Sequence, residues 1–168
     1  MRGVLAVSAG LAAMVVSACS KPEAPAGPPH VVAASDIEAG RYLAMIGSCN
    51  DCHTPGYPQS GGKTPETDRL VGNPVGYHGP WGTSYASNLR ILAQSTTEDG
   101  WVELLKTKRL LPPMPTQNIA KMTETDLRNL YRYIHSLGAA GQAEPENLPP
   151  GVTPSGPYEN MSVVAPKT

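Results

Sequence analysis

The stretch GSCNDCHTPG, residues 47–56, carries two cysteines three positions apart, and a histidine directly follows the second cysteine. Residues three apart on a helical turn lie on the same side, so both thiols can reach one edge of a single flat bound group, such as a porphyrin. The imidazole of the next residue then comes to lie beneath the middle of that bound group. Three chemistries use such a spacing: covalent attachment of a haem, metal binding and a disulfide.

Cys49, Cys52 and His53 match C-x-x-C-H, the pattern of c-type haem attachment. The spacing lets the two thiolates reach the two vinyl groups on one edge of the porphyrin, and His53 becomes the proximal ligand of the iron. The pattern therefore predicts one covalently bound haem c. Such attachment requires an exported chain, and the start of the sequence independently indicates export.

Three other interpretations of this stretch are a zinc half-site, a thioredoxin-like redox pair and a structural disulfide. Structural zinc needs about four ligands, but the other histidines, His30, His78 and His135, are scattered along the chain. A redox pair is expected near a βαβ pattern, which this sequence lacks. Haem attachment is the favoured prediction.

The sixth iron ligand is predicted to be Met114. It lies in LLPPMPTQN, residues 110–118, where prolines on both sides pre-order the backbone and allow a rigid loop to aim a thioether at iron. His78, in the glycine-rich VGYHGPWG, is the competing ligand. Met45 and Met122 are interpreted as core filler, and His135 as a solvated side chain of a helix.

The chain has 168 residues and contains no Phe, whereas Gly (17) and Pro (18) are abundant. This composition is typical of a loop-rich protein with one modest core, to which a large cofactor would contribute. The net charge of −1 creates no overall basic field, so no nucleic-acid partner is expected.

The first residues, MRGVLAVSAGLAAMVVSAC, combine one Arg with an apolar run too short to span a bilayer comfortably, as in an export signal. Their end resembles a bacterial lipobox, in which a cysteine is acylated after cleavage. The resemblance implies a signal peptide over residues 1–18, a lipid anchor on Cys19 and a protein held at the periplasmic side of a bacterial membrane. The alternative is an ordinary signal peptide cut near Ala18. A Pro- and Ala-rich tether, residues 19–34, follows.

Capping patterns delimit a predicted domain over residues 35–138. Ser35 with Glu38 opens a helix that leads to the first cysteine, and Thr123 with Asp126 opens another that ends near Gly138. Residues 96–110 show a third helical pattern. Residues 54–95 are predicted as loop and show no long alternating strand, so we expect an all-α fold.

The tail, residues 139–168, lacks any periodic pattern. Its Leu148, Val152 and Tyr158 are spaced among prolines, which limit the entropy lost on docking. We therefore expect its first half to wrap over the domain surface.

The order of these features resembles a class I cytochrome c. More narrowly, GRYLAMIGSCNDCHTP, YASNL and LPPMPTQNIAKMTETDLRNLYRYIHSLG are similar to the monohaem domains that accept electrons in periplasmic dehydrogenase systems. The sequence departs from those domains at RILAQSTTEDGW, residues 90–101. The resemblance implies that the first and last helices cross beside Gly40. It also implies haem residues, which are Cys49, Cys52, His53 and Met114, with Tyr85 and Asn88 at the haem edge.

A haem with histidine and methionine ligands exchanges single electrons, because both axial positions of its iron are filled. The predicted function is electron transfer, without catalysis, from a periplasmic dehydrogenase toward a terminal oxidase or another cytochrome. One alternative is a gas sensor or small haem enzyme with an open sixth position, and another is a permanent subunit of a larger dehydrogenase. Lys106, Lys108 and Arg109 form either a docking rim for acidic partners or a solvated helix end.

Overall fold

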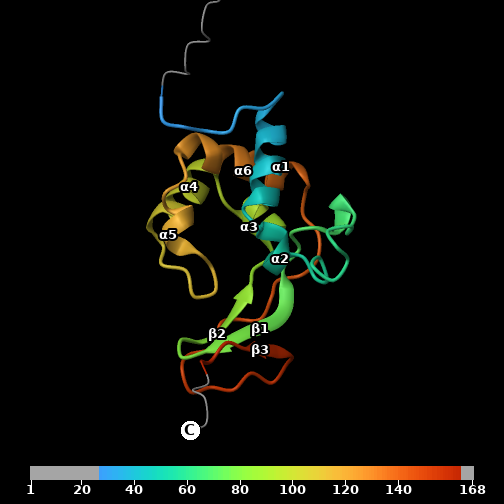
Figure 1. Ribbon diagram of the computed structural model, residues 1–168, viewed down its shortest axis with the longest axis vertical. Helices are drawn as coiled ribbons and strands as arrows, with labels where there is room; N and C mark the ends of the chain where they lie inside the picture. Colours follow the sequence, from blue (N-terminus) through green and yellow to red (C-terminus); the bar gives the residue numbers. More distant parts are fainter. Residues whose placement is uncertain (1–26, 164–168) are drawn as a thin grey trace, which may run out of the picture.

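The computed structural model describes residues 27–163 of the chain. The predicted signal peptide, Cys19 and the first part of the tether lie outside the described residues, as do residues 164–168. Figure 1 shows most of the helices gathered at one end and the three strands at the other, with α2 between them. In chain order the elements are α1 (Asp36–Ile46), α2 (Cys49–His53), η1 (Glu66–Asp68), β1 (Asn73–Gly79), β2 (Gly82–Ala86), α3 (Leu89–Ser95), α4 (Glu98–Thr107), α5 (Thr116–Ile119), α6 (Glu124–Ser136) and β3 (Tyr158–Asn160).

Side-chain caps start the three main helices, as the capping patterns predict for α1 and α6. The hydroxyl of Ser35 accepts a hydrogen bond from the N–H three residues on at 3.2 Å, and those of Thr97 and Thr123 do the same at 3.1 and 3.2 Å. Each cap satisfies a backbone donor that has no partner inside the helix, which is worth about 1 kcal/mol. At its other end α6 stops where Gly138 takes a φ of 70°.

The predicted crossing of the first and last helices at Gly40 is confirmed. A Cβ atom on Gly40 would lie 2.0 Å from the carbonyl oxygen of Asn129 and 2.7 Å from the Cβ of Tyr133, so only glycine allows α1 and α6 to approach this closely. Both α3 and α4 also pack on α6. The core between these helices includes Leu43, Leu70, Trp101, Leu105, Leu127, Leu130, Tyr133 and Ile134.

A buried arginine ties the end of α6 to the loop before β1. Arg90 in α3 is only 6% exposed, and its guanidinium donates to the carbonyls of Gly138 at 2.7 Å, Thr67 at 2.6 Å and Leu137. Its partners are carbonyls rather than a carboxylate. The cation therefore serves as a cap for the last turn of α6, where the helix dipole favours positive charge.

Ion pairs near the surface join the starts of α1 and α4 to the middle of α6. Arg132 in α6 bonds Glu98 in α4 at 2.8 Å and also reaches Asp36 in α1. Arg128, one turn earlier, bonds the same Glu98 at 3.3 Å. The hydrogen bond from Arg132, followed by that from Arg128, holds the pKa of Glu98 below its usual range.

The fold is mixed α/β, so the predicted all-α fold is wrong. Strands β1 and β2 form an antiparallel hairpin, and β3 adds to the other edge of β1 in parallel, which gives the order β2-β1-β3. Residues 54–95, predicted as loop, contain η1, both strands of the hairpin and α3. The hairpin strands are short and rich in glycine, and β1 contains a proline, so they lack the alternation that would indicate them in the sequence.

The third strand comes from the tail, whose first half lies on the domain as expected. Leu148 is half-buried and pairs with Thr83 of β2 in an antiparallel bridge. Farther on, Tyr158 pairs with Gly76 of β1. Val152 and Tyr158 are each 43% exposed, so backbone pairing, more than burial of these side chains, holds the tail.

Candidate functional site

The five-residue helix α2 carries Cys49, Cys52 and His53. The residue before it, Ser48, takes a left-handed φ of 55°, which sets the sharp change of direction from α1 into α2. Both cysteines are partly exposed free thiols, so no disulfide joins them. Burial raises the pKa of the Cys49 thiol to about 11. Residues three apart on a helical turn lie on the same side, so α2 places the two cysteines on one side of the helix.

The ring of His53 is buried and held in one tautomer. It is 6% exposed, and its Nδ1 lies 2.7 Å from the carbonyl oxygen of Ser87. A carbonyl can only accept, so Nδ1 carries the proton and Nε2 keeps its lone pair. Burial lowers the pKa of His53, which favours the neutral imidazole. A neutral imidazole whose Nδ1–H is bonded to a carbonyl is the usual form of a metal-binding histidine.

Side chains and backbone behind α2 fix the end of the helix. The hydroxyl of Thr54 donates to Asn50 Oδ1 at 2.9 Å and accepts from the N–H of Leu70 at 2.8 Å. Gly72 N–H donates to the carbonyl of His53 at 2.9 Å. Leu70 is fully buried with a φ of 61°, a strained conformation for a residue with a branched side chain. The packing around α2 is strong enough to hold that strain.

One face of the hairpin connects α2 to the loop that contains Met114. Tyr77 and Ser84 pair across β1 and β2, so their side chains share a face. Burial, and then a hydrogen bond with the Cys52 side chain, raises the pKa of Tyr77. The hydroxyl of Ser84 donates to the carbonyl of Pro112. The sheet thus contacts the second cysteine and the methionine loop with the same face.

Trp81, in the turn of the hairpin, is turned toward Gly79 of that face. A Cβ atom on Gly79 would lie 2.6 Å from the ring of Trp81, so the indole lies directly over the glycine. Its Nε1–H is buried and has no hydrogen-bond partner within residues 27–163. An indole nitrogen can only donate. This buried donor is therefore available to an acceptor other than the residues that the structure describes.

The site residues predicted from the sequence do not include Tyr77, Ser84 or Trp81. The usable signal was the run YHGPWGTSY, residues 77–85, in which aromatic residues flank a Gly-Pro turn, as in a hairpin. Their shared face follows only from the strand register, which the sequence does not display.

Met114 is half-buried in the loop between α4 and α5. Its N–H donates to Leu111 O at 3.2 Å, and its carbonyl accepts from Thr116 N at 2.8 Å. The thioether thus stands on a short loop with its own hydrogen bonds, and Ser84 ties this loop to the sheet at Pro112.

The other candidate sixth ligands are engaged or exposed. His78 lies on the face of β1 opposite to Tyr77, where Nδ1 contacts Thr83 Oγ1 at 2.8 Å and the ring stands edge-on to Tyr158 at 5.4 Å. His135 is exposed, as expected. The expectation that Met45 fills the core is wrong, because it projects from the outer side of α1 and is 59% exposed. Met122 is half-buried and packs on the core.

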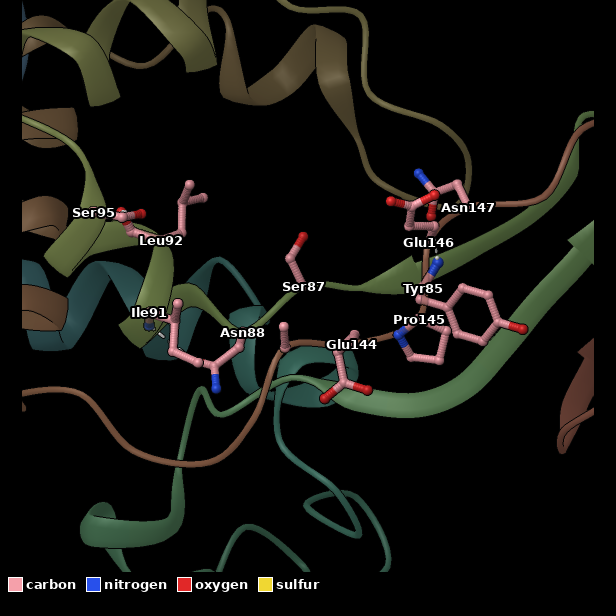
Figure 2. Close-up of a pocket in the computed structure, with 11 residues that line it drawn as sticks. Tyr85, Ser87, Asn88, Ile91, Leu92, Ser95, Glu144, Pro145, Glu146 and Asn147 are labelled. Carbon is pink, nitrogen blue, oxygen red and sulfur yellow. Dashed lines mark hydrogen bonds between the residues drawn. The ribbon is translucent and has the colours of Figure 1, made fainter.

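Tyr85 and Asn88 lie on the tail side of the hairpin. Asn88 caps α3, accepting from Ile91 N at 3.0 Å, while its Nδ2 donates to the tail carbonyls of Ala140 and Gln142. Tyr85 and Asn88 both line a pocket of about 340 Å³ between α3 and the tail, and Figure 2 shows Ser87 between those two walls. Their predicted role at a haem edge stays a prediction.

Neither a cluster of metal-binding side chains nor a membrane-spanning helix occurs in the part of the chain that the structure describes. Within residues 27–163, no three His, Cys, Asp or Glu side chains gather in a way that would hold a metal ion. In the same range, no helix is both long and apolar enough to cross a membrane.

Comparison with known proteins gives one partial likeness. No protein-family model and no solved structure matches the chain. A nicotinate dehydrogenase subunit of Pseudomonas putida is 28% identical over 135 residues, an alignment that covers 74% of this chain. The chain spans only 11% of the length of that relative. The chain is thus similar to a small part of a dehydrogenase subunit.

Proposed function

We propose that this chain is a one-electron carrier that serves a dehydrogenase and holds one haem c. In this proposal Cys49 and Cys52 form the thioether bonds, and His53 and Met114 are the axial ligands. The observation that carries it is His53 itself: the C-x-x-C-H motif lies on α2, and the hydrogen bond to Ser87 leaves Nε2 free to bind iron.

The residues around α2 suit such a group. Both thiols are free and partly exposed, as covalent attachment requires. The hairpin face with Tyr77 and Ser84 touches both the second cysteine and the methionine loop, so it joins the two elements that carry the proposed ligands. The unpartnered N–H of Trp81 on this face suits the carboxylate side chains that every haem carries.

The bound group would supply a reversible one-electron couple between ferric and ferrous iron. The residues of the chain set the conditions for it. His53 is held neutral and oriented by Ser87, so no proton needs to move at this ligand when the charge of the site changes. Met114 is a soft donor and stabilises the ferrous form, which raises the potential. The loop that carries Met114 is fastened to the sheet, and the sheet also contacts Cys52 on α2, which limits rearrangement on electron transfer.

The dehydrogenase part of the proposal rests on the relative, which is named as a dehydrogenase subunit. We expect the donor to be a dehydrogenase at the periplasmic side of a bacterial membrane and the acceptor to be an oxidase or another cytochrome, with Cys19 as the lipid anchor. Lys106 donates to the carbonyls of Ala120 and Met122, so it is not available to a partner. The proposed docking rim for acidic partners then consists of Lys108 and Arg109, both of which are exposed.

Spectroscopy of the purified protein tests this function directly. Protein made with a c-type maturation system should stay red after extraction with acid and organic solvent, because the thioethers are covalent. Oxidised protein should show the weak far-red sulfur-to-iron band, and reduced protein should not bind carbon monoxide. Met114→Ala should abolish the band, open the site to carbon monoxide and lower the potential, whereas the control Met122→Ala should change none of these.

Three results would contradict the proposal in different ways. Haem that extracts freely would remove the covalent assignment. Wild-type protein that binds carbon monoxide rapidly would indicate an open sixth position and so a sensor or an enzyme. A spectrum typical of two histidine ligands would exclude Met114 and point to His78.

A further inference from the structure

We propose that the first part of the tail, residues 139–148, is a strap that positions the Ser87 carbonyl and thereby sets the hydrogen bond on His53. The inference rests on the proposed function, because it concerns the ligand of the proposed haem. It assigns to Asn147 the part of a positioning residue, which acts on the iron ligand through Ser87.

Ser87 lies where the chain leaves β2 and enters α3. The residue is exposed, yet its carbonyl is the acceptor for the buried Nδ1–H of His53. On one side Ser87 borders the pocket of about 340 Å³ between α3 and the tail (Figure 2). The residues near it in the chain, Tyr85 and Asn88, carry the hydrogen bonds that can position its peptide.

The strap bonds the chain on both sides of Ser87. Two residues before it, the N–H of Tyr85 donates to Asn147 Oδ1 at 2.9 Å. One residue after it, Asn88 Nδ2 donates to the carbonyls of Ala140 at 2.7 Å and Gln142 at 3.1 Å. Because these bonds come from two points of the strap, they hold the chain both before and after the Ser87 peptide.

The strap packs closely on two glycines, Gly82 and Gly72. The strap pairs with β2 through two bonds of 2.9 Å between Leu148 and Thr83. A Cβ atom on Gly82 would lie 2.1 Å from the carbonyl oxygen of Leu148, and one on Gly72 would lie 2.4 Å from Glu144 Oε1. Gly72 is also the donor to the carbonyl of His53. The strap thus contacts both backbone segments that form hydrogen bonds with this histidine.

A hydrogen bond from Nδ1–H makes an imidazole a more basic ligand, and outer partners of this kind tune the metal. A more basic ligand favours ferric iron. A strap that keeps the Ser87 carbonyl in line with Nδ1 should therefore keep the potential lower than it would be without the strap. Loosening the strap should raise the potential, which is opposite in sign to the effect expected for loss of Met114.

The test compares Asn147→Ala with Asn160→Ala in the full-length haem protein. Both asparagines are exposed tail residues whose Oδ1 accepts from a backbone N–H at 2.9 Å, but only Asn147 bonds next to Ser87. In Asn147→Ala, exchange of the His53 Nδ1 proton followed by NMR should be roughly fivefold faster, as expected for loss of one hydrogen bond. The reduction potential should rise. Asn160→Ala should match wild type in both measurements.

A rescue variant with unchanged net charge separates an effect on the position of the Ser87 carbonyl from an effect on the stability of the protein. The double variant Glu146→Gln, Asn147→Asp restores the acceptor without changing the net charge, and it should return both the exchange rate and the potential to wild-type values. An Asn147→Ala protein that keeps its haem but shows unchanged exchange and potential would overturn the inference. Wild-type protein without covalent haem would instead refute the proposed function.

Discussion

Replacing the buried arginine of α3 gives a sharp test of how the domain is held together. Arg90→Met keeps an unbranched stem in place of the aliphatic part of the side chain but removes its donors from the carbonyls of Thr67, Leu137 and Gly138. Hydrogen bonds to charged groups are worth about 1.5–3 kcal/mol each. Because the three bonds share one desolvated cation, the low end applies, and the loss should be about 4.5 kcal/mol.

That loss is a large part of the stability of a small domain, which is about 5–15 kcal/mol. Urea denaturation should therefore show a much lower midpoint for Arg90→Met with an unchanged slope. Arg90→Lys keeps the charge but cannot reach three carbonyls, so it should lose about half as much. As a control, Arg69→Met removes one bond, to Thr64 O, from a half-buried arginine and should cost about 1 kcal/mol.

The reasoning fails if Arg90→Met unfolds at the same urea concentration as Arg69→Met. Equal midpoints would mean that water replaces the guanidinium at the end of α6, so that burial of the cation cancels what its hydrogen bonds contribute.

Three further variants test separate features. Gly40→Ala should destabilise the domain by about 1–3 kcal/mol, because its Cβ would clash with the backbone of α6; in Gly100→Ala the Cβ meets mainly threonine hydroxyls, and an equal effect there would contradict the crossing. Glu98→Gln should flatten the acid side of the stability curve: the pKa of Glu98 is lowered from 4.5, so its contribution is present above pH 4.5 and is lost as the pH falls through the lower folded value. Denaturation on both sides of pH 4.5 checks this, and a parallel curve would refute it. Cys19→Ser should release the protein from membranes in soluble, red form, since acyl chains add about 0.8 kcal/mol per buried CH₂; wild-type protein that is equally soluble would exclude the anchor.

The sequence predicts α1, α4 and α6 because the signals of these helices are local, whereas α3 lies in a stretch predicted as loop. Ser35, Thr97 and Thr123 each cap a helix through an N–H only three residues away, and Gly138 lies directly after the last turn of α6. Such contacts need no knowledge of the rest of the chain.

The sheet could not be predicted in the same way. The pairing of Tyr158 with Gly76 and of Leu148 with Thr83 joins residues that are far apart in the chain. The common face of Tyr77 and Ser84 depends on the register of a glycine-rich hairpin. In the sequence Arg90 looks like any other helical arginine, because the carbonyls that it bonds, after α6 and in η1, come from distant parts of the chain. Composition alone does not reveal such non-local contacts.

The chemistry of the site and its tuning therefore come from different parts of the sequence. The motif on α2 and the loop of Met114 supply the proposed reacting atoms, and both are recognisable as short strings. The partner of His53 is a backbone carbonyl, which leaves no trace in the residue type at position 87. In the proposed strap, the position of this carbonyl depends on Asn147, whose contact with Tyr85 links two segments that no local pattern connects. A chain that kept the motif and the methionine but lost the strap should still bind haem covalently, and the change would be found in its potential.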